Sequence, residues 1–389
     1  MSYKYPLATA TWDESEYQAL QDVIASGMFT MGPKVAQFER DFSAYIGSKY
    51  AVMVNSGSSA NLLMVAALFY TKNAHLKLSR GDEVIVPAVS WSTTYYPLYQ
   101  YGLRMKFVDI DLHTLNYDLD ALRLAVTDKT RAIMAVNLLG NPNDFSVIKD
   151  IIGTRNIILM EDNCESLGAE FEGKKAGTFG VMGSFSSFFS HHISTMEGGL
   201  VVTDDEEIYH ILLSMRAHGW TRNLPKENLV CSTKSDDLFE EAFRFVLPGY
   251  NVRPLEMSGA LGIEQLKKLP MLVEERRKNG ALLQAALVDH PNLLIQAEVG
   301  KSSWFGFSLV IRPGGALSRK ELVKSLNILG FECRPIVAGN FAKNDVVKYF
   351  DSKVHDHLKN AEHVDQNGLF IGNHHYSIAD AISELRSLT

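Results

Sequence analysis

Two adjacent histidines, His191 and His192, stand in a polar segment that runs from residue 184 to 199. An imidazole has an ordinary pKa of about 6.5 and can accept and donate protons near neutral pH. No lysine occurs between residues 176 and 225, so this stretch lacks an amine that could form an imine. An isolated pair of histidines more often belongs to a core or a surface. Adjacent side chains also point apart, which disfavours a metal site.

Three other segments place polar or aromatic residues directly after apolar runs. Residues 55–61 (NSGSSAN) lead into an apolar helix whose first N–H groups suit a phosphate, although such a turn is more often only a cap. Trp91 follows the next run and would either stack on a planar ring or join the core. Asp162, with Glu165 close behind, would bind a metal, a ribose hydroxyl or a protonated ring nitrogen, or would simply cap the chain.

The elements that must position these residues form a strand–helix alternation. Strands that are apolar along their length, with helices between them, are typical of a mostly parallel sheet covered on both faces. Ligands of such sheets bind beyond the carboxyl ends of the strands, which is where the polar residues stand. The expected strands are 50–54, 83–87, 105–109, 132–137, 157–161, 183–189 and 200–203, and the expected helices between them are 60–70, 118–125 and 146–151.

Helices are expected at both ends of this alternation. The first starts at the N-cap pattern Asp13-x-x-Glu16 and ends at Gly27, and the second starts after Pro33 and ends at Gly47. After residue 254 the pattern changes to long helices at 255–269 and 272–290, a strand at 304–311 and further helices. We therefore expect a large domain of residues 1–254 and a smaller α+β domain of residues 255–389.

The composition is that of an ordinary enzyme-sized chain. The 389 residues carry 38 Lys and Arg against 45 Asp and Glu, a net charge of −7, which argues against sequence-independent binding to nucleic acid. The longest apolar run, residues 62–70, is too short to span a membrane, and no signal-peptide pattern is present. Three scattered cysteines without a CxxC pair favour a reduced, cytoplasmic location.

Taken in order, the small-residue turn, Trp91, Asp162 and the Ser-x-Ser segment before Gly198-Gly199 resemble the fold-type I pyridoxal phosphate enzymes. More narrowly they resemble the sugar-nucleotide aminotransferases, over nearly the whole chain, including residues 249–254 (GYNVRP). The resemblance implies an α/β fold with a large, mostly parallel cofactor-binding domain and a smaller C-terminal α+β domain. One position departs from the pattern, because His191 stands where the family has its Schiff-base lysine.

The segment SHHISTMEGG, with residues 87–98 and 218–223, resembles the 3-dehydratases of nucleotide-linked 4-keto-6-deoxysugars, in particular those of colitose biosynthesis. The resemblance implies pyridoxal 5′-phosphate and its pyridoxamine form as cofactors, held without a covalent anchor. It implies GDP-4-keto-6-deoxy-D-mannose as the substrate that loses its 3-hydroxyl, with L-glutamate restoring the amine form and ammonia released. His191 would move the proton from the aminomethyl carbon and protonate the leaving hydroxyl.

The resemblance also implies roles for single residues. Asp162 should pair with the pyridine nitrogen, Glu165 should face the ring hydroxyl where aminotransferases usually have glutamine, and Trp91 should stack on the ring. The implied phosphate ligands are Gly57, Ser58, Ser186 and Asn251, the last from the partner in a homodimer with shared active sites. The expected substrate contacts are Met28, Phe29, Thr30, Met31, His218, Arg222, Glu332 and Arg334, with the two arginines as anion partners.

Two other functions compete with this interpretation. A sugar-nucleotide aminotransferase would make an amino sugar, but the missing lysine argues against it. A non-catalytic sugar-nucleotide or cofactor-binding protein would not require a titratable group at His191. A related class of 3-dehydratases uses an iron–sulfur cluster, and the three cysteines are too few for the four thiolates of such a cluster.

Overall fold

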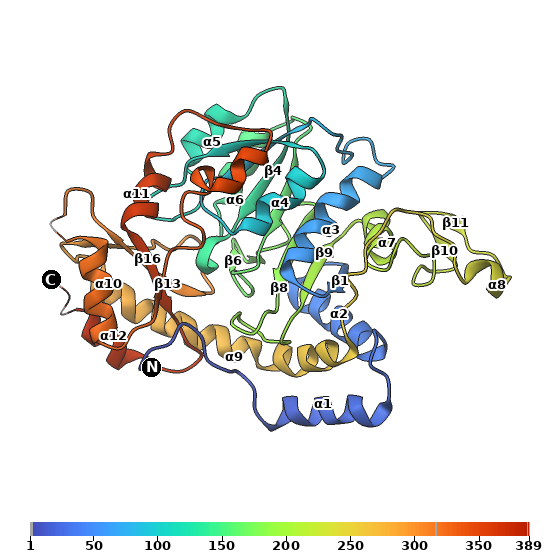
Figure 1. Ribbon diagram of the computed structural model, residues 1–389, viewed down its shortest axis with the longest axis horizontal. Coiled ribbons are helices and arrows are strands. Elements are labelled where there is room, and N and C mark those ends of the chain that lie inside the picture. Colours follow the sequence, from blue (N-terminus) through green and yellow to red (C-terminus); the bar gives the residue numbers. More distant parts are fainter. Residues whose placement is uncertain (1–2, 316, 387, 389) are drawn as a thin grey trace.

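The computed structural model of the protein describes residues 3–315, 317–386 and 388. Its central element is an eight-stranded sheet with strand order β1-β9-β8-β5-β4-β2-β3-β15 (Figure 1). β9 runs antiparallel to both neighbours, and the other neighbouring pairs are parallel. The strands are β1 (Tyr50–Val54), β2 (Glu83–Pro87), β3 (Arg104–Val108), β4 (Thr130–Val136), β5 (Ile158–Asp162), β8 (Met182–Ser186), β9 (Gly199–Thr203) and β15 (Ser352–Val354).

Helices cover both faces of this sheet. Successive residues of a strand point to opposite faces, and here Val84 and Val86 join one apolar cluster whereas Ile85 joins another. The first cluster includes side chains of α3, α4 and α7, and the second includes side chains of α5 and α6. These helices are α3 (Gly57–Tyr70), α4 (Ser92–Gln100), α5 (Leu119–Ala125), α6 (Phe145–Ile152) and α7 (Glu206–Met215).

The two N-terminal helices begin and end where the sequence predicts. In α1 (Glu14–Ser26), Asp13 accepts a hydrogen bond from the Ser15 N–H and its own N–H donates to Glu16, while Gly27 ends the helix with φ 69°. α2 (Pro33–Ile46) has Pro33 in its first turn and Gly47 after its last residue. Its buried face contacts α9, so α2 joins the cover of the sheet near β1.

A second sheet lies in the C-terminal part of the chain. Its strand order is β12-β13-β16-β14, with every neighbouring pair antiparallel. α9, α10 and α12 contribute apolar side chains to the core on this sheet. The elements are β12 (Leu293–Ile295), β13 (Gly306–Ile311), β14 (Cys333–Arg334), β16 (Gly368–Gly372), α10 (Arg319–Ile328), α11 (Lys359–Asn367) and α12 (Ala379–Leu385).

The two long helices predicted at 255–269 and 272–290 are one continuous helix, α9 (Glu256–Leu287), which is a correction to the sequence analysis. Pro270 lies inside α9 and removes one backbone donor. Leu269 and Val273, on the two sides of this proline, are buried in the apolar cluster that also contains side chains of α2, β1, β8 and β9. This packing offsets the missing hydrogen bond, so the helix continues.

Short elements complete the fold. The hairpin β6 (Glu170–Phe171) and β7 (Lys174–Lys175) follows β5. The hairpin β10 (Glu227–Asn228) and β11 (Ser232–Thr233) and the helical turn α8 (Leu238–Glu241) form an arm that projects from the body beyond α7 (Figure 1). None of the helices in the described part of the chain is both long and apolar enough to cross a membrane.

Candidate active site

Asp162, the last residue of β5, lies at the centre of a buried polar cluster. Its Oδ2 accepts hydrogen bonds from Asn61 Nδ2 at 2.8 Å and from Thr94 Oγ1 at 2.7 Å, and its Oδ1 accepts from the Cys164 N–H at 3.1 Å. Asn61 is in α3 and Thr94 is in α4, so one carboxylate joins three segments that leave the sheet at the same edge. These bonds fix the orientation of the carboxylate before any ligand arrives.

A narrow cradle lies beside this cluster, between the start of α3 and the end of β8. A Cβ atom on Gly57 would lie 2.7 Å from Ser186 Cβ and 2.9 Å from Cys164 Sγ, so only glycine fits there. Ser56 caps α3 by accepting from the Ser59 N–H, and the first N–H groups of a helix have no partner within it. Ser58 Oγ donates to Thr93 Oγ1 at 3.1 Å. The cradle therefore offers hydroxyl groups and helix N–H groups to an anion.

Trp91 directly precedes α4, and Glu165 follows the end of β5. Trp91 is the N-cap residue of α4 and is 57% exposed, which leaves its ring available for stacking. Glu165 accepts a hydrogen bond from the Leu139 N–H at 3.0 Å. Burial raises the pKa of Glu165 to about 7, and the nearby Asp162 carboxylate contributes to the increase. Glu165 can therefore hold a proton near neutral pH and act as a hydrogen-bond donor.

His191 lies in the turn between β8 and β9, which Ser187 and Thr195 close through a 2.6 Å contact of their hydroxyl oxygens. Its ring is 5.1 Å from that of Phe305, and its Nδ1 has no hydrogen-bond partner among the described residues. Burial, together with the positive charge of Arg276, lowers the pKa of His191 to about 4. The neighbouring His192 is instead anchored, with Nε2 3.1 Å from the Ser303 carbonyl oxygen. At neutral pH, His191 is thus an uncharged base.

These residues fit pyridoxal phosphate, the cofactor that the resemblance implies. The glycine-lined cradle at Gly57 and Ser186 suits a phosphate, and the oriented Asp162 carboxylate suits a protonated pyridine nitrogen. Glu165 and Trp91 would face the ring hydroxyl and the ring plane. Because Nδ1 of His191 has no hydrogen-bond partner among the described residues, this atom is available for proton transfer.

The segment that contains Asn251 lies against the turn before α3. The Asn55 N–H donates to the Val252 carbonyl oxygen at 3.0 Å. The Asn251 side chain is exposed and accepts from Arg253 Nε at 3.1 Å, and its backbone forms a bridge with Ala217. Among the described residues, the Asn251 side chain forms no hydrogen bond with Gly57, Ser58 or Ser186 of its own chain.

His218 and Arg222 lie together at the base of the arm. The His218 ring is 4.9 Å from the ring of Trp220, and the Arg222 guanidinium lies 4.5 Å above the same tryptophan. Arg222 is exposed, so its charge remains available to an anion.

The other expected substrate contacts fall into two separate places. Phe29 O accepts from the Glu256 N–H, and Thr30 pairs with Leu255, so residues 28–31 lie at the start of α9. Glu332 accepts from the Leu7 N–H at 3.1 Å and forms an ion pair with Arg334, on and next to β14. Within the described residues, no hydrogen bond links these two groups to the Asp162 cluster. The full set of expected members in these places is Met28, Phe29, Thr30, Met31, Glu332 and Arg334.

The sequence analysis missed three contributors to the site. Asn61 and Thr94 orient Asp162, and Asn61 also accepts from Ser184 Oγ at 2.6 Å. Both are buried polar residues within helices. Asn61 stands one helical turn after Gly57, and this spacing in the sequence could have identified it as a residue that faces the site. Arg276, in α9, carries the charge that acts on His191, and nothing in its sequence neighbourhood indicates that role.

Comparison with known proteins gives this geometry a context. The model of the DegT/DnrJ/EryC1/StrS aminotransferase family matches residues 10–383. The chain is 65% identical over 385 residues to GDP-4-keto-6-deoxy-D-mannose 3-dehydratase of Escherichia coli O55:H7, with 99% of both chains covered. A solved structure of the E. coli enzyme with bound hydrated PLP superposes with a TM-score of 0.98, at 64% identity and with 99% of both chains covered.

Another solved structure of GDP-4-keto-6-deoxymannose-3-dehydratase carries a trapped PLP–glutamate geminal diamine. It has a TM-score of 0.97 and 65% identity, and the match covers 98% of this chain and 99% of that one. These likenesses confirm the predicted fold class, the PLP-dependent aminotransferase fold with a mostly parallel sheet. The chain belongs to the DegT/DnrJ/EryC1/StrS aminotransferase family.

Proposed function

We propose that the protein is a pyridoxamine phosphate-dependent 3-dehydratase that converts GDP-4-keto-6-deoxy-D-mannose to GDP-4-keto-3,6-dideoxy-D-mannose. For each hydroxyl group removed, one L-glutamate is oxidised to 2-oxoglutarate and one ammonia is released, so the loss of oxygen from the sugar is balanced. The full-length identity of 65% to a protein with this activity supports the proposal. Such an activity fits the biosynthesis of a deoxysugar of the colitose type, as found in lipopolysaccharide O-antigens.

The observation that carries the proposal is the imidazole of His191 in a site without a lysine. The stretch from residue 176 to 225 contains no lysine, so the chain around His191 cannot anchor the cofactor through an imine. An aminotransferase needs that anchor, whereas a dehydratase needs a group that takes up a proton and passes it on. His191 meets the second requirement because it is uncharged at neutral pH and its Nδ1 has no partner among the described residues.

When bound, the cofactor would supply the amine that joins the 4-keto group and an electron sink for the bond-breaking step. Asp162 would hold the pyridine nitrogen in its protonated form, since Asn61 and Thr94 keep its carboxylate in place. Gly57, Ser58 and Ser186 would bind the phosphate. His191 would accept a proton from the carbon that carries the amine and deliver a proton to the leaving hydroxyl group.

The test is mass spectrometry of a reaction that contains the purified protein, GDP-4-keto-6-deoxymannose, pyridoxal phosphate and L-glutamate. We expect a sugar nucleotide that is lighter by one oxygen, with ammonia and 2-oxoglutarate formed in equal amounts. A product that contains an additional nitrogen would identify an aminotransferase instead. If this sugar is not converted but another 4-keto sugar nucleotide is dehydrated, the proposed reaction would stand and the proposed substrate would be wrong.

We also propose that the protein is a homodimer with shared active sites, in which Asn251 of one subunit reaches the cradle of the other. Large apolar side chains on the arm support this proposal. Leu238 is 84% exposed, Phe239 is 90% exposed and Phe243 is 70% exposed. Side chains of this kind on a projecting element are typical of a surface that a second chain covers.

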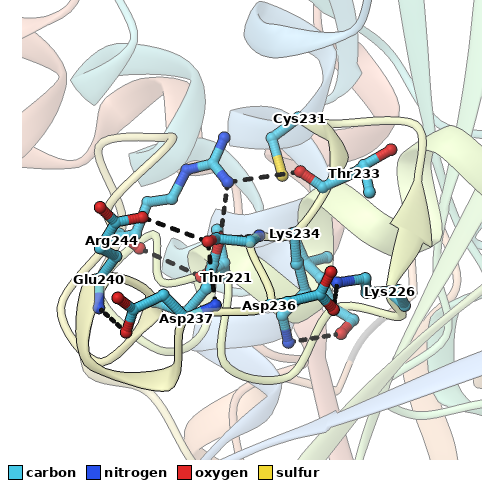
Figure 2. A network of polar contacts seen from close by, with 12 residues as sticks. Thr221, Lys226, Cys231, Thr233, Lys234, Asp236, Asp237, Glu240 and Arg244 are labelled. Carbon is cyan, nitrogen blue, oxygen red and sulfur yellow. Dashed lines mark hydrogen bonds and ion pairs between the residues drawn. The ribbon is translucent and has the colours of Figure 1, made fainter.

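Polar contacts connect the loops of the arm to one another (Figure 2). Thr221 Oγ1 donates to Glu241 at 2.6 Å, Arg244 forms an ion pair with Glu241 at 2.7 Å, and Lys226 pairs with Asp236. The side chain of Thr221 and the Arg244 guanidinium hold the pKa of Glu241 below its usual value. Phe239 and Phe243 are largely exposed, so their rings remain available to a partner.

We further propose the division into a large domain, residues 1–254, and a small domain, residues 255–389. The separate sheet β12-β13-β16-β14 supports it, since all four strands come from the second range. β15 also comes from that range but extends the large sheet by pairing with β3, so this strand would connect the small domain to the large one.

A cytoplasmic location is proposed as well, in keeping with three cysteines that are free thiols.

A further inference from the structure

Arg276 is a buried arginine in the middle of α9. It is 5% exposed, and its Nη1 donates to the Asn373 carbonyl oxygen at 2.8 Å and to the Phe305 carbonyl oxygen at 3.0 Å. Its Nε has no hydrogen-bond partner, and it forms no ion pair with a carboxylate among the residues that the structure describes. Burial lowers the pKa of Arg276 to about 10, which still leaves the guanidinium charged at neutral pH. A buried charge without a counter-ion is destabilising, so its presence calls for an explanation.

Two pairs of histidines lie next to the two residues that hold this guanidinium. Phe305, one of the two carbonyl partners of Arg276, has its ring 5.1 Å from His191 and 5.7 Å from His192. Asn373, the other partner, directly precedes His374 and His375. In all four histidines burial lowers the pKa, and the positive charge of Arg276 lowers it further. One permanent charge thus acts on both pairs.

The groups that face His191 come from three elements. Its own turn supplies His192 and the ring of Phe188, the segment before β13 supplies the ring of Phe305, and α9 supplies Arg276. Arg277 acts on His192 and is held by the Ser302 and Gly168 carbonyl oxygens. Within the described chain, no carboxylate forms a hydrogen bond or an ion pair with His191. The pKa of His191 is therefore lowered first by burial and then by the charge of Arg276, with no carboxylate bonded to the ring.

We propose that Arg276 is a positioning residue that keeps His191 in its uncharged, proton-accepting form and makes a proton on His191 easy to pass on. A like charge destabilises the imidazolium, which makes the neutral ring a weaker base and the protonated ring a stronger acid. A stronger acid suits the protonation of a poor leaving group such as hydroxide. This inference rests on the proposed function of His191 as the acid–base group, and it names the residue that tunes that group.

The experiment measures the protonation of single histidines in the unliganded protein. Deuterium exchange at the imidazole C2 position depends on the ionisation of the ring, and mass spectrometry of fragment ions separates His191 from His192. In Arg276→Met the titration midpoint of His191 should rise by about one pH unit from its value of about 4. In Arg276→Lys, which keeps a positive charge, it should rise clearly less.

His210 is the internal control. Burial also lowers its pKa, but the charged group that acts on it is Glu206 rather than Arg276. Its midpoint should be the same in all variants. If Arg276→Met is not recovered folded, Arg276→Gln, which keeps a donor for the two carbonyl groups, carries the same expectation. An unchanged midpoint of His191 in the uncharged variant, or an equal change in Arg276→Lys, would overturn the proposal.

The measurement separates this proposal from the proposed function because no substrate is present. A protein that shows the expected midpoints but does not dehydrate the sugar would retain the role of Arg276 and lose the assigned reaction. A protein that dehydrates the sugar but shows no change in Arg276→Met would lose only the role of Arg276. In the active enzyme, the acidic limb of the pH profile of kcat should move upward in Arg276→Met by the same pH interval as the midpoint of His191.

Discussion

At the scale of single residues, the chemistry of the site depends on which groups carry a proton. His191 and Glu165 depart from their ordinary pKa values in opposite directions, because burial disfavours the charged form of each. Near neutral pH the site therefore holds a neutral imidazole together with a carboxyl group that is partly protonated. A neutral base and a weak acid are the pair that a proton relay requires.

Replacing His191 by asparagine should remove the relay and leave the cofactor site intact. We expect His191→Asn to lower turnover on the order of 10²–10⁴-fold, because an amide cannot exchange protons near neutral pH. The cofactor should still bind, which the absorbance of bound pyridoxal phosphate would report. His192→Asn is the matched control, since His192 is anchored to the Ser303 carbonyl oxygen, and it should retain far more turnover. Equal losses in both variants would contradict the assignment.

Glu165 should leave a mark on the pH dependence of stability. Its pKa is about 7 in the folded protein and about 4.5 when unfolded, so the folded state binds the proton more tightly. The resulting stabilisation is complete below about pH 4.5 and is lost as the pH rises through about 7. It amounts to at most roughly 3 kcal/mol, from a difference of about 2.5 pH units.

Glu165→Gln has no proton to lose in this range. Urea unfolding of the cofactor-free protein at pH 5 and pH 8 should therefore show a smaller loss of stability in Glu165→Gln than in the unmodified protein. A difference of the opposite sign would mean that the carboxylate is stabilised in the folded state.

At the scale of elements, a buried ion pair joins three parts of the large sheet and its cover. Arg216, the C-cap of α7, pairs with Glu39 of α2, and its Nη1 also donates to the Met53 carbonyl oxygen in β1 at 2.8 Å. Glu39 accepts in turn from the Met53 N–H at 2.7 Å. The two side chains are only 4% and 11% exposed, so solvent cannot replace either partner.

Glu39→Gln should leave the Arg216 charge buried and uncompensated. The expected cost is about 3–5 kcal/mol in the free energy of unfolding, measured by chemical denaturation followed by circular dichroism. Asp150→Asn is the control, because it breaks the exposed pair with Arg123, whose side chains are 51% and 70% exposed. That change should cost less than about 1 kcal/mol. Similar costs for both variants would show that burial does not decide the strength of the pair.

The strands and first helices could be predicted because their apolar runs and caps are local signals. β1 and β2 coincide with the predicted ranges, and the other predicted strands of the large sheet differ mainly at their ends. α9 was divided at Pro270 because the loss of one hydrogen bond is visible in the sequence, whereas the packing that offsets it is not. β15 is three residues long and mostly exposed, so only its pairing with β3 makes it a strand.

In the site, too, residues with a local sequence signal could be predicted, whereas contacts between distant segments could not. Strand-end residues such as Asp162 could be placed because parallel strands end at one edge of the sheet. The partners that orient it, Asn61 and Thr94, come from two helices and become neighbours only in the folded chain. Arg276 could not be found, since an arginine within a helix is ordinarily solvated.

At the scale of the whole molecule, the exposed aromatic residues of the arm should control assembly. Phe239→Asp places a charge at an aromatic position of α8 that is 90% exposed and should shift the proposed dimer to monomers. Sedimentation velocity would report this change, and turnover should fall with the monomer fraction if the sites are shared. Leu124→Asp is the control, because Leu124 is 74% exposed on α5, away from the arm, and should leave the dimer unchanged. Dimers that persist in Phe239→Asp would place the interface elsewhere.

α9 has a mechanical consequence for the two sheets. Its 32 residues span about 48 Å, and along that length it contacts α1, then α2 beside the large sheet, and β12 and α12 in the small domain (Figure 1). A continuous helix that packs on both domains resists rotation of one domain against the other. Rocking of the small sheet would have to bend the helix, and Pro270 is the position at which bending is easiest. Arg276 follows Pro270 in α9. Bending of the helix at Pro270 would therefore change the position of the Arg276 charge relative to His191.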